Sequence, residues 1–527
     1  MTPSDRPRDE PEAHLEDTFD AQPAELSGFA AETTGKNVSR AGAWNAFSHL
    51  IPQVYLLVQS VAAARFLGPD DMGRQSFIAW AAVSMVFVWS RGLPDAVLRF
   101  TAETLGRERP GDVLGLARWA TRVEVAVGTL AFAGVASLGV VRGELRRAWI
   151  LAGVVCAMNV LRGIPLALLR ARLRWRESSM IGVWSGLFAM AGTVVVLALG
   201  YGIAAMFAVE ALVGLGATLY TRRRAGVAMS ELPGPPTSDP ALHRNVARYA
   251  VASSLQAVFA YVVWQRSEFL FLDRYADDSE IALYSVAFGG VAVITRVLQA
   301  FAAVVPGSVA TLYGAGAFDR IKRGYARSVR LLLVLTLPLT AVSAALGPVA
   351  VDLVYGDEYS RAGRVLLVAL AAVPAVALFH LAFGLVQGLG RLRVLFAASV
   401  AGTVADLAFA FALVPRHGAF GAAIANAAAQ VAASLVVLAY AGRFATGADW
   451  GVLRLVRAAL AATAAGGIAW MAVEVLPPLP GLVVGGIAGL AAYGAFLRLL
   501  RVIPATDREW LAGALGSRGR WVSRLLG

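Results

Sequence analysis

Residues 43–95 read AWNAFSHLIPQVYLLVQSVAAARFLGPDDMGRQSFIAWAAVSMVFVWSRGLPD. They form two apolar segments, 43–66 and 73–95, on either side of the short polar stretch Arg65–Ser76. An α-helix needs about 20 apolar residues to cross the hydrocarbon core of a bilayer. This stretch therefore predicts two membrane-spanning helices joined by a tight turn.

The same alternation of apolar segments and polar breaks continues along the chain. Hydrophobic residues make up 58% of the 527 residues and charged residues only 16%, whereas a soluble domain carries about 25% charge. This composition excludes a disordered protein and argues against a soluble multidomain enzyme. The pattern predicts an all-α polytopic membrane protein with about 14 transmembrane helices: 43–66, 73–95, 118–140, 148–169, 179–200, 203–220, 247–272, 281–305, 329–350, 362–388, 393–414, 419–440, 452–474 and 480–500.

Positive charge is concentrated in alternate loops. Arginines cluster at 170–176, 222–248, 320–330 and 498–524, whereas the intervening loops are acidic near residues 70, 277 and 357. Because cytoplasmic loops carry the excess of Lys and Arg, the sequence predicts that both termini lie inside, in the cytoplasmic membrane of a bacterium. This distribution explains most of the net charge of +12 without a nucleic-acid partner.

The Pro-rich break 221–246 divides the chain into two halves. We predict a disordered acidic cytosolic tail (1–40), two six-helix lobes (41–220 and 247–440) joined by this cytosolic linker, two additional helices (441–500) and a basic cytosolic tail (501–527). The stretch Arg65–Ser76 parallels Arg274–Ser285 in the corresponding loop of the second half. Six helices per lobe predict a parallel repeat about a pseudo-two-fold axis along the membrane normal, as in transporters with a central site.

Five short motifs resemble those of a known family. They are Arg65–Gly73, Leu283–Ser285, Tyr355–Tyr359, Gln387–Arg391 and His417–Ala423. Together they resemble the polysaccharide (lipid-linked oligosaccharide) flippases of the multidrug/oligosaccharidyl-lipid/polysaccharide exporter superfamily, over residues 41–440. The resemblance implies alternating-access movement of an undecaprenyl-pyrophosphate-linked oligosaccharide, the polysaccharide repeat unit. It also implies membrane lipids, a polysaccharide polymerase and glycosyltransferases as partners.

Charged residues inside the predicted spans are candidate site residues, because each costs about 2.5–3.5 kcal/mol to insert. Arginine pairs well with phosphate groups, so four arginines are candidates for binding the pyrophosphate: Arg91, Arg162, Arg266 and Arg296. For Arg91, neutralisation by Asp95 in its own helix is the alternative. Three carboxylates are candidates for coupling to an ion or proton: Glu268, Asp406 and Glu210. For Glu210 and Asp406 the alternative is a structural pair with an arginine. His380 could titrate, and the alternative for it is a hydrogen bond between helices.

Motifs of soluble catalysis are missing from the sequence. It contains no P-loop, no His-Glu-x-x-His and no Gly-x-Ser-x-Gly, and its single cysteine, Cys156, excludes a Cys-based metal cluster. We therefore expect no enzyme, no cofactor and no bound metal. A peptidoglycan lipid-precursor flippase and a drug/cation antiporter remain alternatives within the superfamily. A polyprenyl-dependent membrane glycosyltransferase, ligase or polymerase is the alternative of another class, because Asp70 and Asp71 resemble an acidic catalytic motif.

Overall fold

The computed structural model describes residues 35–90, 92–302, 305–504 and 507, without the side chains of 35–50, 89, 297 and 300–301. Within these ranges the chain is helical and contains no strand. Eleven of the described helices are long and apolar enough to cross a membrane, or twelve spans if one bent pair counts as one. The predicted all-α polytopic fold is therefore confirmed, whereas the number fourteen stays a prediction.

The first group of helices is called the N-terminal half here. It contains α2 (Gly35–Ser90), α3 (Gly92–Gly106), α4 (Pro110–Arg142), α5 (Arg146–Leu161), α6 (Gly163–Ala171), α7 (Trp175–Ala198) and α8 (Ile203–Ser230).

The second group is the C-terminal half, which is followed by two further helices. The half contains α9 (Pro240–Trp264), α10 (Phe269–Tyr275), α11 (Asp278–Ala302), α12 (Val305–Gly314), α13 (Phe318–Tyr355), the short 3₁₀ helix η2 (Asp357–Tyr359), α14 (Ser360–Gly388) and α15 (Leu392–Phe444). The further helices are α16 (Val452–Val475) and α17 (Pro478–Leu499).

Two of these helices each contain a break at a glycine. Gly68 in α2 and Gly418 in α15 have positive φ angles of 76° and 52°, which glycine adopts without strain. A straight helix of the 53 residues of α15 would be about 80 Å long, far more than the bilayer core. The chain folds back instead: a Cβ on Gly402 would lie 3.0 Å from the carbonyl oxygen of Ala429. The parts of α15 before and after Gly418 therefore correspond to the predicted spans 393–414 and 419–440.

The segment between the two halves is shorter than predicted. Helix α8 continues to Ser230 and α9 begins at Pro240, so the predicted linker 221–246 is wrong at both ends. The sequence TRRRAGVAMS is rich in Arg, Ala and Met, which favour helix. At the other end, Asp239 caps α9 by accepting hydrogen bonds from the backbone N–H groups of Ala241 and Leu242 at 2.8 and 3.1 Å, and proline suits the first helical position. At the N-terminus, α2 begins at Gly35, before the predicted boundary at residue 41; residues 1–34 lie outside the described residues.

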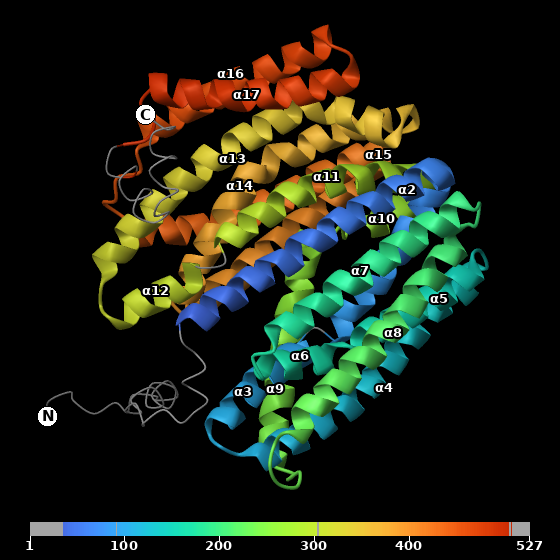
Figure 1. The fold of residues 1–527 in the computed structure, drawn as a ribbon. Helices are drawn as coiled ribbons and strands as arrows, with labels where there is room; N and C mark the ends of the chain where they lie inside the picture. Colours follow the sequence, from blue (N-terminus) through green and yellow to red (C-terminus); the bar gives the residue numbers. More distant parts are fainter. Residues whose placement is uncertain (1–34, 91, 303–304, 505–506, 508–527) are drawn as a thin grey trace, which may run out of the picture.

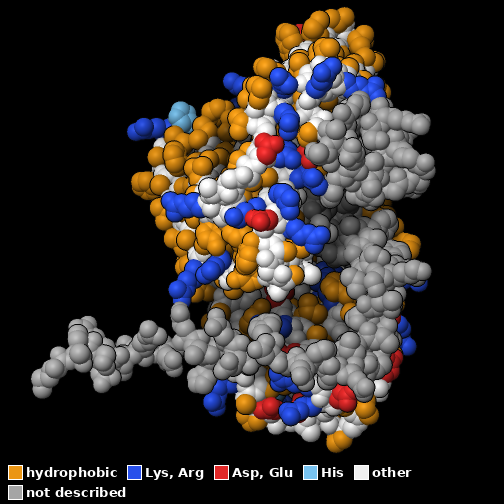
Figure 2. Space-filling view, turned by 90° about the vertical axis from the view of Figure 1, so that its left-hand side faces the viewer, with side chains coloured by type: hydrophobic (Ala, Val, Ile, Leu, Met, Phe, Trp, Pro, Cys, Tyr) orange, Lys and Arg blue, Asp and Glu red, His pale blue; other side chains and the backbone are white. Residues whose placement is uncertain are grey.

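The helices run between two ends of an elongated molecule. In Figure 1, α4 to α8 pack together on one side and α11 to α17 on the other, with α2 between them and with α16 and α17 outermost beside α13. We call the end that carries the start of α2, α12 and the loop before α9 the terminal end, and the other end the opposite end. Arginine and lysine side chains outnumber acidic ones on the face that includes the terminal end (Figure 2).

Candidate functional site

The first feature of the site is a break in a membrane helix. Residues 265–268 separate α9 from α10, so the predicted continuous span 247–272 is wrong. Arg266 lies in the left-handed region with a φ of 55°, a strained conformation for a residue other than glycine. The break frees a backbone carbonyl: Gln265 accepts a hydrogen bond of 3.0 Å from Trp80 Nε1 on α2. It also turns Ser267 and Glu268 toward neighbouring helices.

Two carboxylates meet beside this break. Glu268 and Asp406 are fully buried, and their carboxyl groups lie within interaction distance of each other. Ser267 Oγ donates a hydrogen bond of 2.5 Å to Asp406 Oδ2, and Tyr284 donates one of 2.9 Å to Glu268 Oε2. The other oxygen of each carboxyl, Glu268 Oε1 and Asp406 Oδ1, is buried and has no hydrogen-bond partner among the described residues. Buried carboxylates in this state require a proton or a cation.

Arg266 lies next to the acidic pair but contacts aromatic rings. Its guanidinium is 5.3 Å from the ring centre of Phe269 and 5.1 Å from that of Phe288 on α11. Glu268 contacts Tyr284 of the same helix α11 and Asp406 of α15. Arg266 and Glu268 thus each have a partner on another helix. The cation–π contacts stabilise the charge of Arg266 in this desolvated position.

Arg296 on α11 lines a cavity of about 90 Å³ inside the C-terminal half. The cavity also contacts Gln265 of the broken segment and Asn426 of α15. Arg296 Nη1 donates to Gln299 Oε1 at 3.2 Å, and Gln299 Nε2 lies 3.2 Å from His380 Nε2 on α14. The predicted hydrogen bond of His380 between helices is therefore confirmed.

Asn426 lies between the cavity and the acidic pair. Its side chain donates a long hydrogen bond of 3.4 Å to Val263 O and accepts one of 2.7 Å from Gln430; it also interacts with Glu268. The amide thus connects the cavity of Arg296 to the carboxylates. The arrangement can hold an anion at Arg296 and a cation or proton at Glu268 and Asp406.

The structure does not bring the remaining candidates to this cluster. Arg162 lies between α5 and α6 in the N-terminal half and donates to Asn159 Oδ1 at 2.9 Å. Glu210 is half-buried on α8. Within the described part of the chain, neither Glu210 nor Asp406 makes an ion pair, so the alternative of a structural pair with arginine finds no support. Arg91 lies outside the described residues.

Sequence reasoning missed the neutral members of the site. Ser267, Tyr284 and Asn426 carry no charge, so the insertion cost that singled out Glu268 and Asp406 did not reveal them. A signal was present for Tyr284, which is the central residue of the motif Leu283–Ser285. Asn426 and Gln430 are the polar residues in an otherwise alanine-rich stretch, 425–433.

The opposite end is closed by contacts between the two halves. Arg142 of α4 donates to both oxygens of Asp273 on α10, at 2.6 and 2.5 Å. Arg74 of α2 donates to Asp278 at the start of α11 at 2.8 Å, and Gly73 packs directly against the backbone carbonyl of Asp278. These contacts hold the two halves together at the opposite end.

Comparisons with known proteins address the fold. The family model described as MatE matches residues 254–412, a segment that contains the broken helix and both carboxylates. The structure is similar to that of the lipid II flippase MurJ in an inward closed conformation, with a TM-score of 0.69 at 11% identity over 87% of this chain and 98% of MurJ. It is similar to an inward-facing multidrug resistance MATE family transporter, with a TM-score of 0.59 at 15% identity over 76% of this chain and 98% of the transporter.

The chain has the fold of a MOP-superfamily transporter. A MOP-superfamily transporter from Pyrococcus furiosus is also similar, with a TM-score of 0.56 at 14% identity over 77% of this chain and 95% of that chain. No curated protein sequence matches this chain significantly. These three similar structures are described as a flippase and two transporters.

Proposed function

We propose that this protein is a flippase that moves an undecaprenyl-pyrophosphate-linked oligosaccharide across the cytoplasmic membrane of a bacterium by alternating access. The observation that carries the proposal is the cavity in which Arg296 lies beside Asn426 and the buried pair Glu268–Asp406. An arginine exposed to a cavity inside a membrane protein can replace the hydration of a phosphate group. Neither Arg296 nor Arg266 makes an ion pair with a carboxylate within the described residues, which leaves positive charge for an anionic substrate.

In this proposal the acidic pair couples transport to an ion or proton. Binding of a cation or proton between Glu268 Oε1 and Asp406 Oδ1 would neutralise the buried charge and hold the segment 265–268 in one conformation. Release would restore repulsion between the two carboxylates. Because the break separates α9 from α10, a change at this position alters the angle between two parts of one helix; both parts contact α15, but α9 also packs against α3 and α10 against α11.

Two comparisons support a lipid-linked substrate over a drug. The flippase MurJ aligns with 87% of this chain, whereas the MATE transporter aligns with 76%. The first comparison also favours the second candidate function, a flippase for the peptidoglycan lipid precursor, because MurJ is described as a lipid II flippase.

The positive charge at the terminal end supports an orientation with both termini inside, where glycosyltransferases would supply the substrate. A polysaccharide polymerase would then use it on the outside.

The test is the leaflet in which polyprenyl-linked glycans reside in a deletion strain. We expect complete repeat units to accumulate on the cytosolic leaflet, with loss of surface polysaccharide, and rescue by the wild-type gene but not by the Arg296→Glu variant. Accumulation of the peptidoglycan precursor would instead support the second candidate. Repeat units that reach the outer leaflet and remain unpolymerised would contradict the flippase and point to an enzyme, and unchanged glycolipids would point to drug transport.

A further inference from the structure

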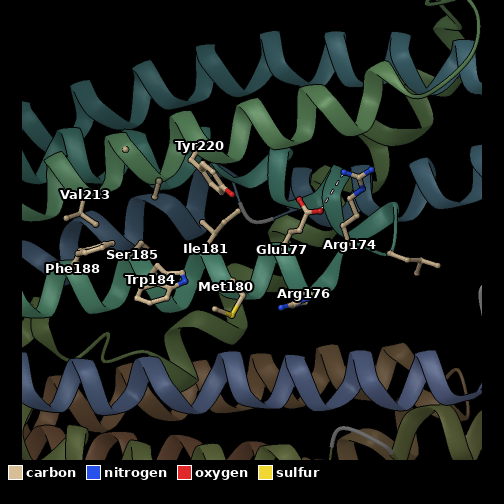
Figure 3. Close-up of a pocket in the computed structure, with 13 residues that line it drawn as sticks. Arg174, Arg176, Glu177, Met180, Ile181, Trp184, Ser185, Phe188, Val213 and Tyr220 are labelled. Carbon is tan, nitrogen blue, oxygen red and sulfur yellow. Dashed lines mark ion pairs between the residues drawn. The ribbon is translucent and has the colours of Figure 1, made fainter.

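A groove of about 780 Å³ lies between α7 and α8 on the flank of the N-terminal half (Figure 3). We call it the α7–α8 groove. Trp184 and Phe188 of α7 and Tyr220 of α8 form its apolar wall, and Arg174, Arg176 and Glu177 lie at its terminal end. The rings of Trp184 and Phe188 stack with their centres 6.2 Å apart. The proposed function uses none of these residues.

The groove faces away from the cavity of Arg296. Gly186 on α7 packs against Tyr55 of α2, the helix that contacts the C-terminal half. Trp184 precedes Gly186 by two residues, which places the two on different faces of the helix. Trp184, Phe188 and Tyr220 are 51%, 58% and 56% exposed, and no residue lines both the groove and the cavity. In a membrane-spanning protein such a surface contacts lipid rather than the transported substrate.

The length of the groove matches one leaflet. From Arg174 to Phe188 the chain along α7 rises about 21 Å, at 1.5 Å per residue. Half of the bilayer, with its headgroup region, is about 20–22 Å thick. The wall therefore runs from the membrane boundary, marked by the arginines, to about the middle of the bilayer. This is the depth that an acyl chain of one leaflet reaches.

The terminal end of the groove is positively charged. The adjoining segments 170–177 and 222–231 contain seven arginines and two glutamates. Both glutamates already have arginine partners: Glu231 accepts from Arg174 at 2.6 Å, and Glu177 accepts from Arg224 at 2.9 Å. A third arginine, Arg222, pairs with Glu124 of α4 at 3.0 Å, and arginines still outnumber these three glutamates. The excess of arginine at the membrane boundary attracts an anionic headgroup.

We propose that the α7–α8 groove binds a glycerophospholipid with an anionic headgroup, taken from the leaflet at the terminal end. One acyl chain lies along Trp184, Phe188 and Tyr220, and the phosphate lies beside Arg174 and Arg176. The charge of the arginine cluster selects an anionic over a zwitterionic lipid. Because the groove faces away from the cavity of Arg296, we expect it to bind a membrane phospholipid and not the transported polyprenyl lipid.

Gly216 provides the variant that tests the apolar wall. It lines the groove, and a Cβ at this position would meet no atom within 4 Å, so Gly216→Phe fills the groove without disturbing helix packing. Gly226 on the same helix is equally open but does not line the groove, so Gly226→Phe is the matched control. Arg176→Gln tests the headgroup contact, with Arg147→Gln at the start of α5, at the opposite end, as its control.

The measurement is the retention of lipid by the purified full chain in native mass spectrometry, from vesicles of equal parts phosphatidylglycerol and phosphatidylcholine. We expect the wild type and Gly226→Phe to retain phosphatidylglycerol preferentially and Gly216→Phe to lose it. Arg176→Gln should retain lipid but lose about fivefold in the preference for phosphatidylglycerol, the effect of one charge near a membrane surface, and Arg147→Gln should not.

Three results would overturn the proposal. Gly216→Phe could retain as much phosphatidylglycerol as the wild type, or the wild type could retain both lipids equally. Alternatively, added undecaprenyl phosphate could displace phosphatidylglycerol from the wild type, which would make the groove a site for the transported lipid. None of these results depends on transport activity, so they are distinguishable from a failure of the proposed flippase function.

Discussion

Arg142 binds both carboxylate oxygens of Asp273, with hydrogen bonds of 2.6 and 2.5 Å, and so connects α4 of the N-terminal half to α10 of the C-terminal half. The guanidinium also lies 4.6 Å from the ring centre of Phe77. A bidentate pair supported by an aromatic face is stronger than an ordinary surface ion pair. In alternating access, the opposite end must break this pair whenever it opens.

We therefore expect Asp273→Asn to favour the state in which the opposite end is open. The pair is partly exposed, so its loss should cost about 1 kcal/mol and change the ratio of the two states about fivefold. Spin labels at Glu144 and Arg274 would report the distance between the halves at this end. Exchange of the two charges, Arg142→Asp with Asp273→Arg, should restore the wild-type distribution; a distribution unaffected by either change would exclude a gating role.

Gly73 should be required for closure of the opposite end. A Cβ at this position would overlap the backbone carbonyl of Asp278, and backbone atoms cannot move aside as a flexible side chain can. We expect Gly73→Ala to separate α2 from the start of α11 and to reduce transport at least tenfold, about 1.4 kcal/mol. Gly289→Ala on α11, where a Cβ would meet nothing within 4 Å, is the control. Equal transport by the two variants would contradict the prediction.

The acidic pair should bind the coupling ion as a unit. Addition of the ion at about 100 times its dissociation constant would stabilise the purified protein by about 2.7 kcal/mol. We expect Glu268→Gln and Asp406→Asn each to abolish this stabilisation, measured as the shift in unfolding temperature on addition of sodium or on acidification. Glu474→Gln on α16 is the control carboxylate. If Glu210→Gln abolishes the shift and the two pair variants retain it, the coupling site lies in the N-terminal half instead.

The two arginines of the C-terminal half should respond differently to substitution. Arg296→Glu places a negative charge in the cavity and should abolish transport while the protein level stays normal. Arg266→Glu adds a third carboxylate beside Glu268 and Asp406 and should reduce the amount of folded protein. By contrast, Arg266→Gly relieves a positive φ that costs about 1 kcal/mol or more, so it should lose transport but not stability. Protein level and export in a deletion strain separate these outcomes.

Asp507 should hold the segment after α17 to the C-terminal half. Its carboxylate is 1% exposed and accepts hydrogen bonds of 2.9 Å from both Arg327 and Arg330 on α13. Asp507→Ala leaves two partly buried arginines without this carboxylate, which should cost about 2 kcal/mol after allowance for their contact with solvent. We expect faster proteolysis after residue 500 with unchanged proteolysis near residue 235. Equal cleavage rates in the variant and the wild type would contradict the assignment.

The all-helical, multi-span pattern could be predicted from sequence, because a helix that crosses the bilayer must satisfy its backbone within about 20 consecutive residues. Gly68 and Gly418, where the long helices break, fall within or at the edge of predicted turns for the same reason. The break at 265–268 could not be predicted. It contains neither glycine nor proline, and the contacts that surround it, such as those of Arg266 with Phe269 and Phe288, come from the packing of the helices.

The candidate site shows a similar limit. The insertion cost of a buried charge identified Glu268 and Asp406 individually, and both belong to the site. Their juxtaposition depends on how α15 packs against the end of α9, which a single sequence does not specify. For Arg162 and Glu210 the same criterion selected residues that lie apart from the site, because the cost of burial indicates that a residue has a role without indicating which one.

The segment that joins the two halves, between α8 and α9, is held to the N-terminal half at Thr237. Thr237 donates from its hydroxyl to Asp112 Oδ1 at 2.5 Å and from its backbone N–H to Gly111 O at 2.9 Å, which fastens the segment before α9 to the start of α4. A tether of this kind allows one half to rotate relative to the other but prevents them from sliding apart along the membrane. In the proposed transport cycle, the displacement should therefore be smallest beside Thr237 and grow with distance from it, so the path for the proposed glycan should open on the side of the molecule farthest from this segment.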